Sequence, residues 1–230
     1  WSSDVCSSDL LEYKWKFNTL PEETIVKKLA SEINITDTIS TLLIQRGITT
    51  YDEAKNYFRP SFADLHNPFL MDGMERAVER VLNGIKRNEK ILVYGDYDVD
   101  GTNATSMLYL FIKSINGDVS YYVPDRVQEG YGISKQGILH ANEQGVSLII
   151  SVDCGITAIE PISFASSLGI DTIVCDHHQP GETVPEAYAV LDPLKPGCNY
   201  PFKYLCGCGV ALKLMHGILL KMYDDMYRVE

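Results

Sequence analysis

The stretch ILVYGDYDVDG, residues 91–101, joins an apolar run to three aspartates at alternate positions. The apolar run, closed by a glycine, predicts a strand buried on both faces, as in parallel sheets. Asp96, Asp98 and Asp100 follow it with no Lys or Arg among them. Alternate side chains of an extended chain share one face, so three carboxylates would crowd one surface. The stretch therefore predicts a buried strand that ends at a cluster of negative charge.

From residue 91 onward, short apolar runs alternate with segments that have helical spacing. We expect strands at 90–95, 118–124, 146–153, 170–176 and 187–193, with helices at 102–116, 134–145 and 157–169 between them. Such alternation predicts parallel strands joined by right-handed crossovers. The expected fold is α/β, a doubly wound and mainly parallel sheet preceded by a small helical N-terminal segment.

Three parts of the chain differ in composition. Residues 1–10, WSSDVCSSDL, lack an initiator Met, are rich in Ser and nearly repeat themselves, so we interpret them as a non-native or artefactual segment. Residues 11–90 are polar, with helical patterns that begin and end at Pro, Gly and capping residues. Residues 91–230 form the expected catalytic α/β domain.

Polar side chains follow three of the expected strands. Asp96 to Asp100 end the first, Asp153 ends the third, and Asp176-His177-His178 end the fourth. In parallel sheets, ligands collect at the carboxyl ends of the strands, so these ends should converge. Each residue alone has an ordinary alternative, since an Asp after a strand commonly caps a turn and two His can lie on the surface.

Their joint occurrence favours a bound cation. Several unpaired carboxylates repel one another strongly at close range, and none of the three segments contains a Lys or Arg. Carboxylates with imidazole favour Mn²⁺ or Mg²⁺, and four or more carboxylates suggest two ions. We predict Asp96, Asp98, Asp153 and His177 as metal ligands, with Asp153 shared, but the spacing leaves open which of Asp96, Asp98 and Asp100 binds directly. Adjacent side chains on a strand face opposite ways, so His178 is assigned to the substrate phosphate.

Two further segments are candidates for substrate binding. In PDRVQEGYG, residues 124–132, Arg126 either grips a phosphate or pairs with Glu129. In CGCGVALKL, residues 206–214, two closely spaced glycines start a helix and either present amides to an anion or only pack tightly. The predicted substrate-binding residues are Arg126, Gly130, Tyr131, Gly207 and Gly209. In GITAIE, Thr157 and Glu160 have the spacing of a capping box.

Charge and composition limit the function. The net charge is −11, and residues 91–230 carry 8 basic against 17 acidic side chains, the opposite of a usual nucleic-acid binder. Either the substrate is no polyanion, or bound cations or other domains supply positive charge. No apolar run approaches a membrane span and no secretory signal is present, so we expect a cytoplasmic protein with reduced thiols and no membrane association.

The motifs GDYDVDG, SVDCGIT and CDHHQP, in this order and spacing, resemble the DHH phosphoesterase superfamily. The flanking segments PDRVQEGYGIS, LDPLKPGCNYPFKYLCGCGVALKL and RGITTYDEAKNYFRPSFADLHNP narrow the resemblance to its bacterial single-strand-specific exonucleases. The similarity covers about residues 14–224.

The resemblance implies 5′-to-3′ hydrolysis of single-stranded DNA to 5′-mononucleotides, with Mn²⁺ or Mg²⁺, in DNA repair and recombination. It matches Asp96, Asp98, Asp100, Asp153, His177 and His178 to the family's metal and catalytic residues, and we assign the catalytic roles to His178 and Asp100. Single-stranded DNA is the expected partner, single-strand-binding protein and a helicase are further candidates, and a monomer is expected.

The sequence departs from the family in one respect. The family's fourth motif, an Asp in a GTxAD-like segment, does not occur before the chain ends at Glu230. We therefore interpret the chain as truncated before that motif, with impaired activity. Two alternatives are a DHH phosphodiesterase that acts on short oligonucleotides, cyclic dinucleotides or pyrophosphate, and a non-catalytic DHH scaffold.

Overall fold

The computed structural model describes residues 16–227, and side chains through residue 224. The interpretation of residues 1–10 as a non-native segment therefore lies outside the described residues. The chain divides into two compact units, Trp1–Leu65 and His66–Glu230.

The first unit is a small group of helices. It contains α1 (Glu23–Ile33), α2 (Asp37–Ile44), α3 (Tyr51–Phe58) and the 3₁₀ turn η1 (Phe62–Asp64). The start of α3 is fixed by a capping box, in which Thr50 accepts from the amide of Glu53 and the Glu53 carboxylate accepts from the amide of Thr50. The expected helical character of this region is confirmed.

The second unit contains a five-stranded sheet whose strands are all parallel. The strands are β1 (Lys90–Gly95), β2 (Asp118–Tyr122), β3 (Val146–Val152), β4 (Asp171–Cys175) and β5 (Ala189–Leu191), in the spatial order β2-β1-β3-β4-β5. The first strand, β1, lies inside the sheet, with β2 on one side and β3, β4 and β5 on the other. This order confirms the predicted doubly wound α/β fold.

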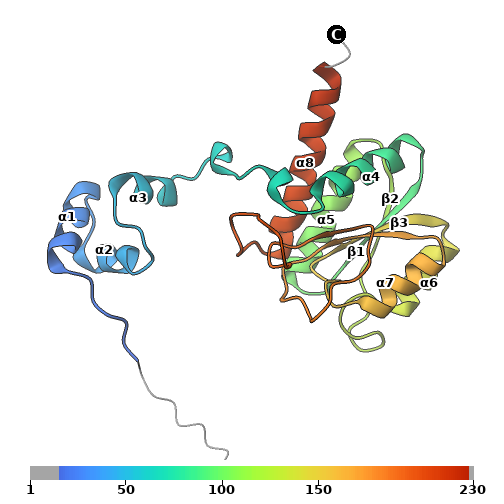
Figure 1. Cartoon of the computed structure of the whole chain (residues 1–230), viewed down its shortest axis with the longest axis horizontal. Coiled ribbons are helices and arrows are strands. Elements are labelled where there is room, and N and C mark those ends of the chain that lie inside the picture. The colour runs from blue at the N-terminus through green and yellow to red at the C-terminus, as the bar shows by residue number, and fades with distance from the viewer. Residues whose placement is uncertain (1–15, 228–230) are drawn as a thin grey trace, which may run out of the picture. The chain divides into compact units, whose positions relative to one another are not determined.

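Helices cover both faces of the sheet (Figure 1). Alternate side chains of β1 belong to two separate cores, Ile91 and Val93 to one and Leu92 and Tyr94 to the other. The first core is closed by α4 (Met74–Lys86), α5 (Val99–Ser114) and α8 (Gly207–Tyr227); the second is closed by α6 (Lys135–Glu143) and α7 (Ile159–Ser167). Burial on both faces explains why the strands are continuously apolar in sequence.

Helix α4 belongs to the second unit, although the sequence analysis grouped its residues with the N-terminal helices. Met74, Ala77, Val78 and Val81 recur at helical spacing and are buried in the first core, where α4 packs against α8 and β5. The 3₁₀ turn η2 (Pro68–Leu70) precedes α4. The amphipathic pattern identified the helix, but it did not say which surface the apolar face would cover.

The capping box predicted at residues 157–160 is wrong. Helix α7 begins at Ile159, its N-cap is Ala158, and the structure assigns this start no side-chain cap. The preceding turn is held elsewhere, because the amide of Ile156 donates to the carboxylate of Asp176 at 2.9 Å.

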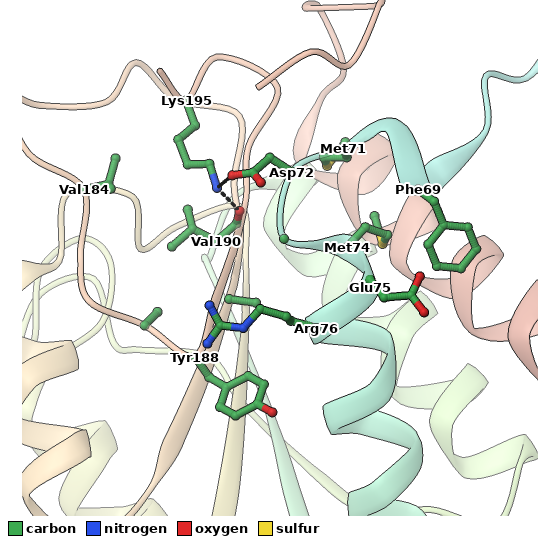
Figure 2. Close-up of a pocket in the computed structure, with 13 residues that line it drawn as sticks. Phe69, Met71, Asp72, Met74, Glu75, Arg76, Val184, Tyr188, Val190 and Lys195 are labelled. Atoms are coloured by element: carbon green, nitrogen blue, oxygen red, sulfur yellow. Dashed lines mark hydrogen bonds and ion pairs between the residues drawn. The ribbon is translucent and has the colours of Figure 1, made fainter. Parts of the chain in front are cut away.

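Strand β5 forms one edge of the sheet, next to the start of α4 (Figure 2). A cavity of about 420 Å³ lies there, lined by residues of α4, its preceding turn and the β5 segment. Lys195 crosses this edge, donates to the carbonyl of Val190 at 2.9 Å and pairs with Asp72 at 2.6 Å. Arg76 lies over the ring of Tyr188, 5.2 Å from its centroid.

Helix α8 is the longest helix and packs against α4 and α5. Val210, Ala211, Leu214 and Ile218 form its buried stripe. Among residues 16–227, no helix is both long enough and apolar enough to cross a membrane.

Candidate metal centre

The carboxyl ends of β1, β3 and β4 bring acidic and imidazole side chains into one cluster. Two groups have ligand atoms that all lie within 4.8 Å of one another: Asp96, Asp98 and Asp153, and Asp153, His177 and His178. Asp153 is common to both. The strand order explains this geometry, because β3 lies between β1 and β4.

Asp153 is the most constrained residue of the cluster. It has a left-handed backbone, with φ of 61°, and its amide donates to the carbonyl of Cys175 at 2.9 Å. Its Oδ1 lies 3.0 Å from Nε2 of His177, yet it is buried and has no well-formed hydrogen bond within the described part of the chain. Burial, together with the charges of Asp100 and Asp98, raises the pKa of Asp153 to about 7. A strained backbone and an unsatisfied carboxylate are typical of a functional site.

Asp96 and Asp98 differ in environment. Asp96 is buried, and its Oδ1 has no hydrogen-bond partner among residues 16–224. Burial, assisted by the charge of Asp98, raises the pKa of Asp96 despite an opposing backbone hydrogen bond from Tyr97. Asp98 is exposed and caps α5, where its Oδ1 accepts from the amide of Gly101 at 2.9 Å. One carboxylate is therefore available in the interior and the other at the rim.

Asp100 is held by the start of α8. Its two carboxylate oxygens accept from the amides of Gly207, at 2.6 Å, and Cys208, at 2.8 Å. Burial alone would raise the pKa of Asp100, but these hydrogen bonds outweigh it and lower the pKa. Its Oδ2 lies 3.7 Å from Nε2 of His177. The aspartate predicted to be catalytic is thus fixed as an anion beside the cluster.

The start of α8 bears differently on its two glycines. The start of α8 does present amides to an anion, and in the structure that anion is the protein's own Asp100. A Cβ on Gly207 would lie 2.5 Å from Oδ1 of Asp153, so this close approach requires glycine. A Cβ on Gly209 would meet the side chain of Leu205 at 3.2 Å, which is a packing contact.

His178 is oriented by Asp176, a residue that the sequence analysis noted after its strand but did not assign to the site. Its Nδ1 lies 2.7 Å from Oδ1 of Asp176, which also accepts from the amides of His177 and His178. Burial lowers the pKa of His178, but the hydrogen bond and charge of Asp176 outweigh it and raise the pKa. With a carboxylate on Nδ1, as for histidines at metal centres, Nε2 points away from Asp176 and lies 3.4 Å from the hydroxyl of Tyr131.

The segment at residues 124–132 forms the rim of the cluster. Glu129 accepts from Tyr122, from Ser134 and from the amide of Asp125, and no ion pair joins it to Arg126 in the described residues. The hydroxyl of Tyr131 donates to the carbonyl of Asp153 at 3.2 Å. Gly130 lies in an exposed turn, with φ of 82°.

Asp192 was missed by the sequence analysis. It follows β5 and is buried, and its Oδ2 lacks a hydrogen-bond partner among residues 16–224. Burial, followed by the charge of Asp176, raises the pKa of Asp192 to about 6. The signal was present in the sequence, because Asp192 follows the apolar run AVL as Asp153 follows its own strand.

The cluster fits a divalent cation. Buried carboxylate oxygens without donors, on Asp96 and Asp153, gain partners if a cation lies between them. The ligand atoms are oxygen and imidazole nitrogen, which suit Mn²⁺ or Mg²⁺. The thiols of Cys206 and Cys208 are not members of either group.

Comparisons with known proteins agree with this geometry. Residues 90–229 match the family described as "DHH family, N-terminal domain". The single-stranded-DNA-specific exonuclease RecJ of Bacillus subtilis (strain 168) is 40% identical over 213 residues, which make up 93% of this chain and 27% of that protein. The chain therefore spans about a quarter of the length of this relative.

Two solved structures are similar. RecJ in complex with Mn²⁺ from Thermus thermophilus matches with a TM-score of 0.70 and 25% identity, over 89% of this chain and 28% of that chain. An exonuclease RecJ bound to manganese matches with a TM-score of 0.61 and 31% identity, over 66% of this chain and 38% of that chain.

The family match extends over more than half of the chain and begins at β1. It includes all the residues of both ligand groups, from Asp96 to His178. The three motifs that meet at the strand ends thus all lie within the matched region. The chain belongs to the DHH family.

Proposed function

We propose that this chain is the catalytic part of a metal-dependent exonuclease that hydrolyses single-stranded DNA from the 5′ end and releases 5′-mononucleotides. The observation that carries the proposal is Asp153, a buried, unsatisfied carboxylate shared by both potential ligand groups. The substrate is inferred from the similarity to RecJ proteins, whose names specify single-stranded DNA.

The proposed cofactor is Mn²⁺ or Mg²⁺, with two ions as the expected number. Asp96, Asp98, Asp153 and His177 would hold the ions, with Asp153 shared, and His178, whose ligand atom lies in the same group as those of Asp153 and His177, would contact the substrate phosphate. When bound, divalent cations supply Lewis-acid catalysis, which makes water a stronger nucleophile and stabilises charge on phosphoryl oxygens.

The chain's own residues prepare the site for this chemistry. The amides of Gly207 and Cys208 keep Asp100 ionised beside His177, which favours the orientation of that imidazole. Asp176 fixes the ring of His178, whose Nε2 can contact a phosphoryl oxygen or a metal. Arg126 and Tyr131 at the rim are proposed to contact the substrate, together with Gly130. Gly207 and Gly209, also predicted to bind substrate, are proposed to support the site through the start of α8.

The remaining features of the proposal concern the protein in the cell. We infer a cytoplasmic monomer that acts on single-stranded DNA in repair and recombination. Single-strand-binding protein and a helicase are the proposed protein partners. The bound cations would offset the acidic balance of this chain when DNA approaches.

The test uses the full-length gene product with Mn²⁺ and a 5′-labelled single strand, a 5′-labelled duplex, dinucleotides and pyrophosphate. We expect release of labelled mononucleotide from the single strand only, and loss of that release in Asp153→Asn. Asp118→Asn, which changes an exposed carboxylate at the start of β2, serves as the control and should retain activity. Preference for dinucleotides or pyrophosphate would replace this proposal with a short-substrate phosphodiesterase, and no cleavage at all would favour a scaffold.

A further inference from the structure

Tyr97 lies between two of the cluster's carboxylates in sequence, and its ring contacts both predicted substrate-binding side chains of the rim. The guanidinium carbon of Arg126 lies 5.2 Å from the centroid of the Tyr97 ring. The ring of Tyr131 meets Tyr97 edge-on, with centroids 6.4 Å apart and planes at 84°. The sequence analysis gave Tyr97 no role.

The two acids nearest to Arg126 in sequence, Asp125 and Glu129, accept other hydrogen bonds. Asp125 accepts from the amides of Val127, at 2.8 Å, and Gln128, at 3.0 Å, through the same oxygen, Oδ1. Glu129 accepts from the hydroxyl of Tyr122 and from the amide of Asp125, each at 2.9 Å. Within residues 16–224, Arg126 forms no ion pair and no side-chain hydrogen bond; its guanidinium lies over the Tyr97 ring, and its positive charge acts on Asp96. Its hydrogen-bond donors are therefore free for an incoming anion.

Tyr131, the second contact of the Tyr97 ring, also contacts the metal centre. Tyr131 donates its hydroxyl to the carbonyl of Asp153 at 3.2 Å, and its ring lies edge-on to His178, with centroids 6.0 Å apart. The contacts Arg126–Tyr97–Tyr131 thus join the free guanidinium to two residues of the cluster. Because Tyr97 directly follows Asp96 and precedes Asp98, the same turn sets the position of the ring and of both carboxylates.

We propose that Tyr97 is a positioning residue that holds the guanidinium of Arg126 at a fixed distance from the metal centre, ready for the terminal phosphate of a DNA strand. The inference rests on the proposed function and adds to it the residue that positions Arg126. A terminal phosphate suits this arrangement, since a guanidinium is a planar fork matched to phosphate oxygens. Without the ring, an exposed arginine beside Asp96 and Asp98 would be drawn toward their charges.

Packing in a hydrophobic core explains the position of the Tyr97 ring less well than its contact with Arg126 does. Tyr97 is half-buried, and neither hydrophobic core includes it. Its hydroxyl has no hydrogen bond in the described residues, so the face and edge of the ring make its contacts. A phenylalanine ring should therefore serve almost as well, whereas an aliphatic side chain of similar size should not.

The test compares Tyr97→Leu and Tyr97→Phe with the wild type in the full-length gene product with Mn²⁺. The substrates are two twelve-nucleotide thymidine oligonucleotides. One carries a 5′-phosphate and the other a 5′-hydroxyl, and they are otherwise identical. We expect Tyr97→Leu to raise KM about fivefold on the 5′-phosphate strand, the size of an exposed to partly buried cation–π contact, with kcat changed less than about twofold. Tyr97→Phe should rescue KM, and on the 5′-hydroxyl strand Tyr97→Leu should match the wild type.

Tyr121→Leu is the matched control. Tyr121 is likewise packed edge-on to another tyrosine, Tyr109, but it is more exposed than Tyr97 and lies on β2 outside the cluster. It should retain wild-type KM on both strands. Equal Mn²⁺ affinity and thermal unfolding of all variants establish that the metal centre and the fold are intact.

A binding measurement separates this inference from the proposed function. Fluorescence anisotropy of the same two strands, labelled at the 3′ end and with Ca²⁺ in place of Mn²⁺, reports affinity without requiring cleavage. If the wild type cleaves neither strand, the proposed function fails, and the anisotropy measurement alone then tests the positioning role of Tyr97. The inference is overturned if the wild type does not prefer the 5′-phosphate, if Tyr97→Leu weakens both strands equally, if it lowers kcat alone, or if Tyr97→Phe is as weak as Tyr97→Leu.

Discussion

Replacing Asp153 with Asn removes a carboxylate whose ionisation is disfavoured by burial and by neighbouring negative charges, and it keeps the shape of the side chain. The substitution also suits the backbone, because Asn tolerates the left-handed conformation, with φ of 61°, better than other side chains apart from Asp. We expect Asp153→Asn to be more stable than the wild type without metal, and to bind Mn²⁺ at least about tenfold more weakly.

The magnitude follows from the pKa of Asp153, which burial, then the charges of Asp100 and Asp98, raise from 3.8 to about 7. A raised pKa in the folded state means that stability is lost as pH rises from the unfolded to the folded value. Because one pKa unit corresponds to about 1.4 kcal/mol, the raised pKa of Asp153 lowers the free energy of unfolding by about 4 kcal/mol at pH 8, where the group is ionised, and by about 2 kcal/mol at pH 5, where the folded protein keeps it protonated. Both figures are upper limits, since Asp98 is exposed and water screens its charge.

The assay is urea denaturation followed by circular dichroism, in EDTA at pH 5 and pH 8, with Asp118→Asn as the control. Asp153→Asn should gain stability over the wild type at pH 8, and about half of that gain should vanish at pH 5. With saturating Mn²⁺ at pH 8 the order should reverse, because the wild type gains binding energy that the variant lacks. A variant that is less stable than the wild type at pH 8 in EDTA, or a gain that does not depend on pH, would refute the reasoning.

Three further outcomes test other contacts of the centre and the fold. Asp176→Asn should lower the pKa of His178 in the metal-free protein, measured by NMR titration, because the charge that outweighs burial is removed; an unchanged pKa would contradict this. Gly207→Ala should weaken Mn²⁺ binding at least about tenfold by calorimetry, since its Cβ would lie 2.5 Å from Asp153, whereas Gly209→Ala should stay within about twofold; similar effects of both would be inconsistent with the geometry. Arg80→Met should lower the free energy of unfolding by about 2–3 kcal/mol, because its 11% exposed side chain pairs with Glu89 at 2.7 Å and Asp171 at 2.6 Å; Arg87→Met, at a 72% exposed side chain, should change it by less than about 0.5 kcal/mol, and equal losses would argue against the role of the buried pairs.

The fold could be predicted from sequence where the signal was local. Leu148, Ile149 and Ile150 read as a strand buried on both faces because their neighbours are also apolar, and β3 lies at the centre of the sheet. The rule that ligands gather at the carboxyl ends of parallel strands then placed Asp96, Asp153 and His177 together before any distance was known. Their individual roles as ligands remain predictions.

The contacts that could not be predicted join residues that are distant in sequence. Asp100 accepts from the amide of Gly207, 107 positions away, and no local pattern indicates that pairing. The alternatives for Arg126 could not be separated either, because the answer depends on Tyr122 and Ser134 occupying Glu129. Tyr97 was overlooked because an aromatic residue between two acids has no periodic signal.

The crossing of Lys195 over β5 also bears on how the protein avoids unwanted association. The carbonyl of Leu191 accepts from the amide of Asp176 on the β4 side, so the carbonyl of Val190, one residue earlier, faces the open side of the strand. An unpaired strand edge is a template on which another chain can add a strand. Lys195 donates to the carbonyl of Val190 and places a charge there, and Gly73, just before α4, lies against the same carbonyl, so both hinder the addition of another strand at this edge.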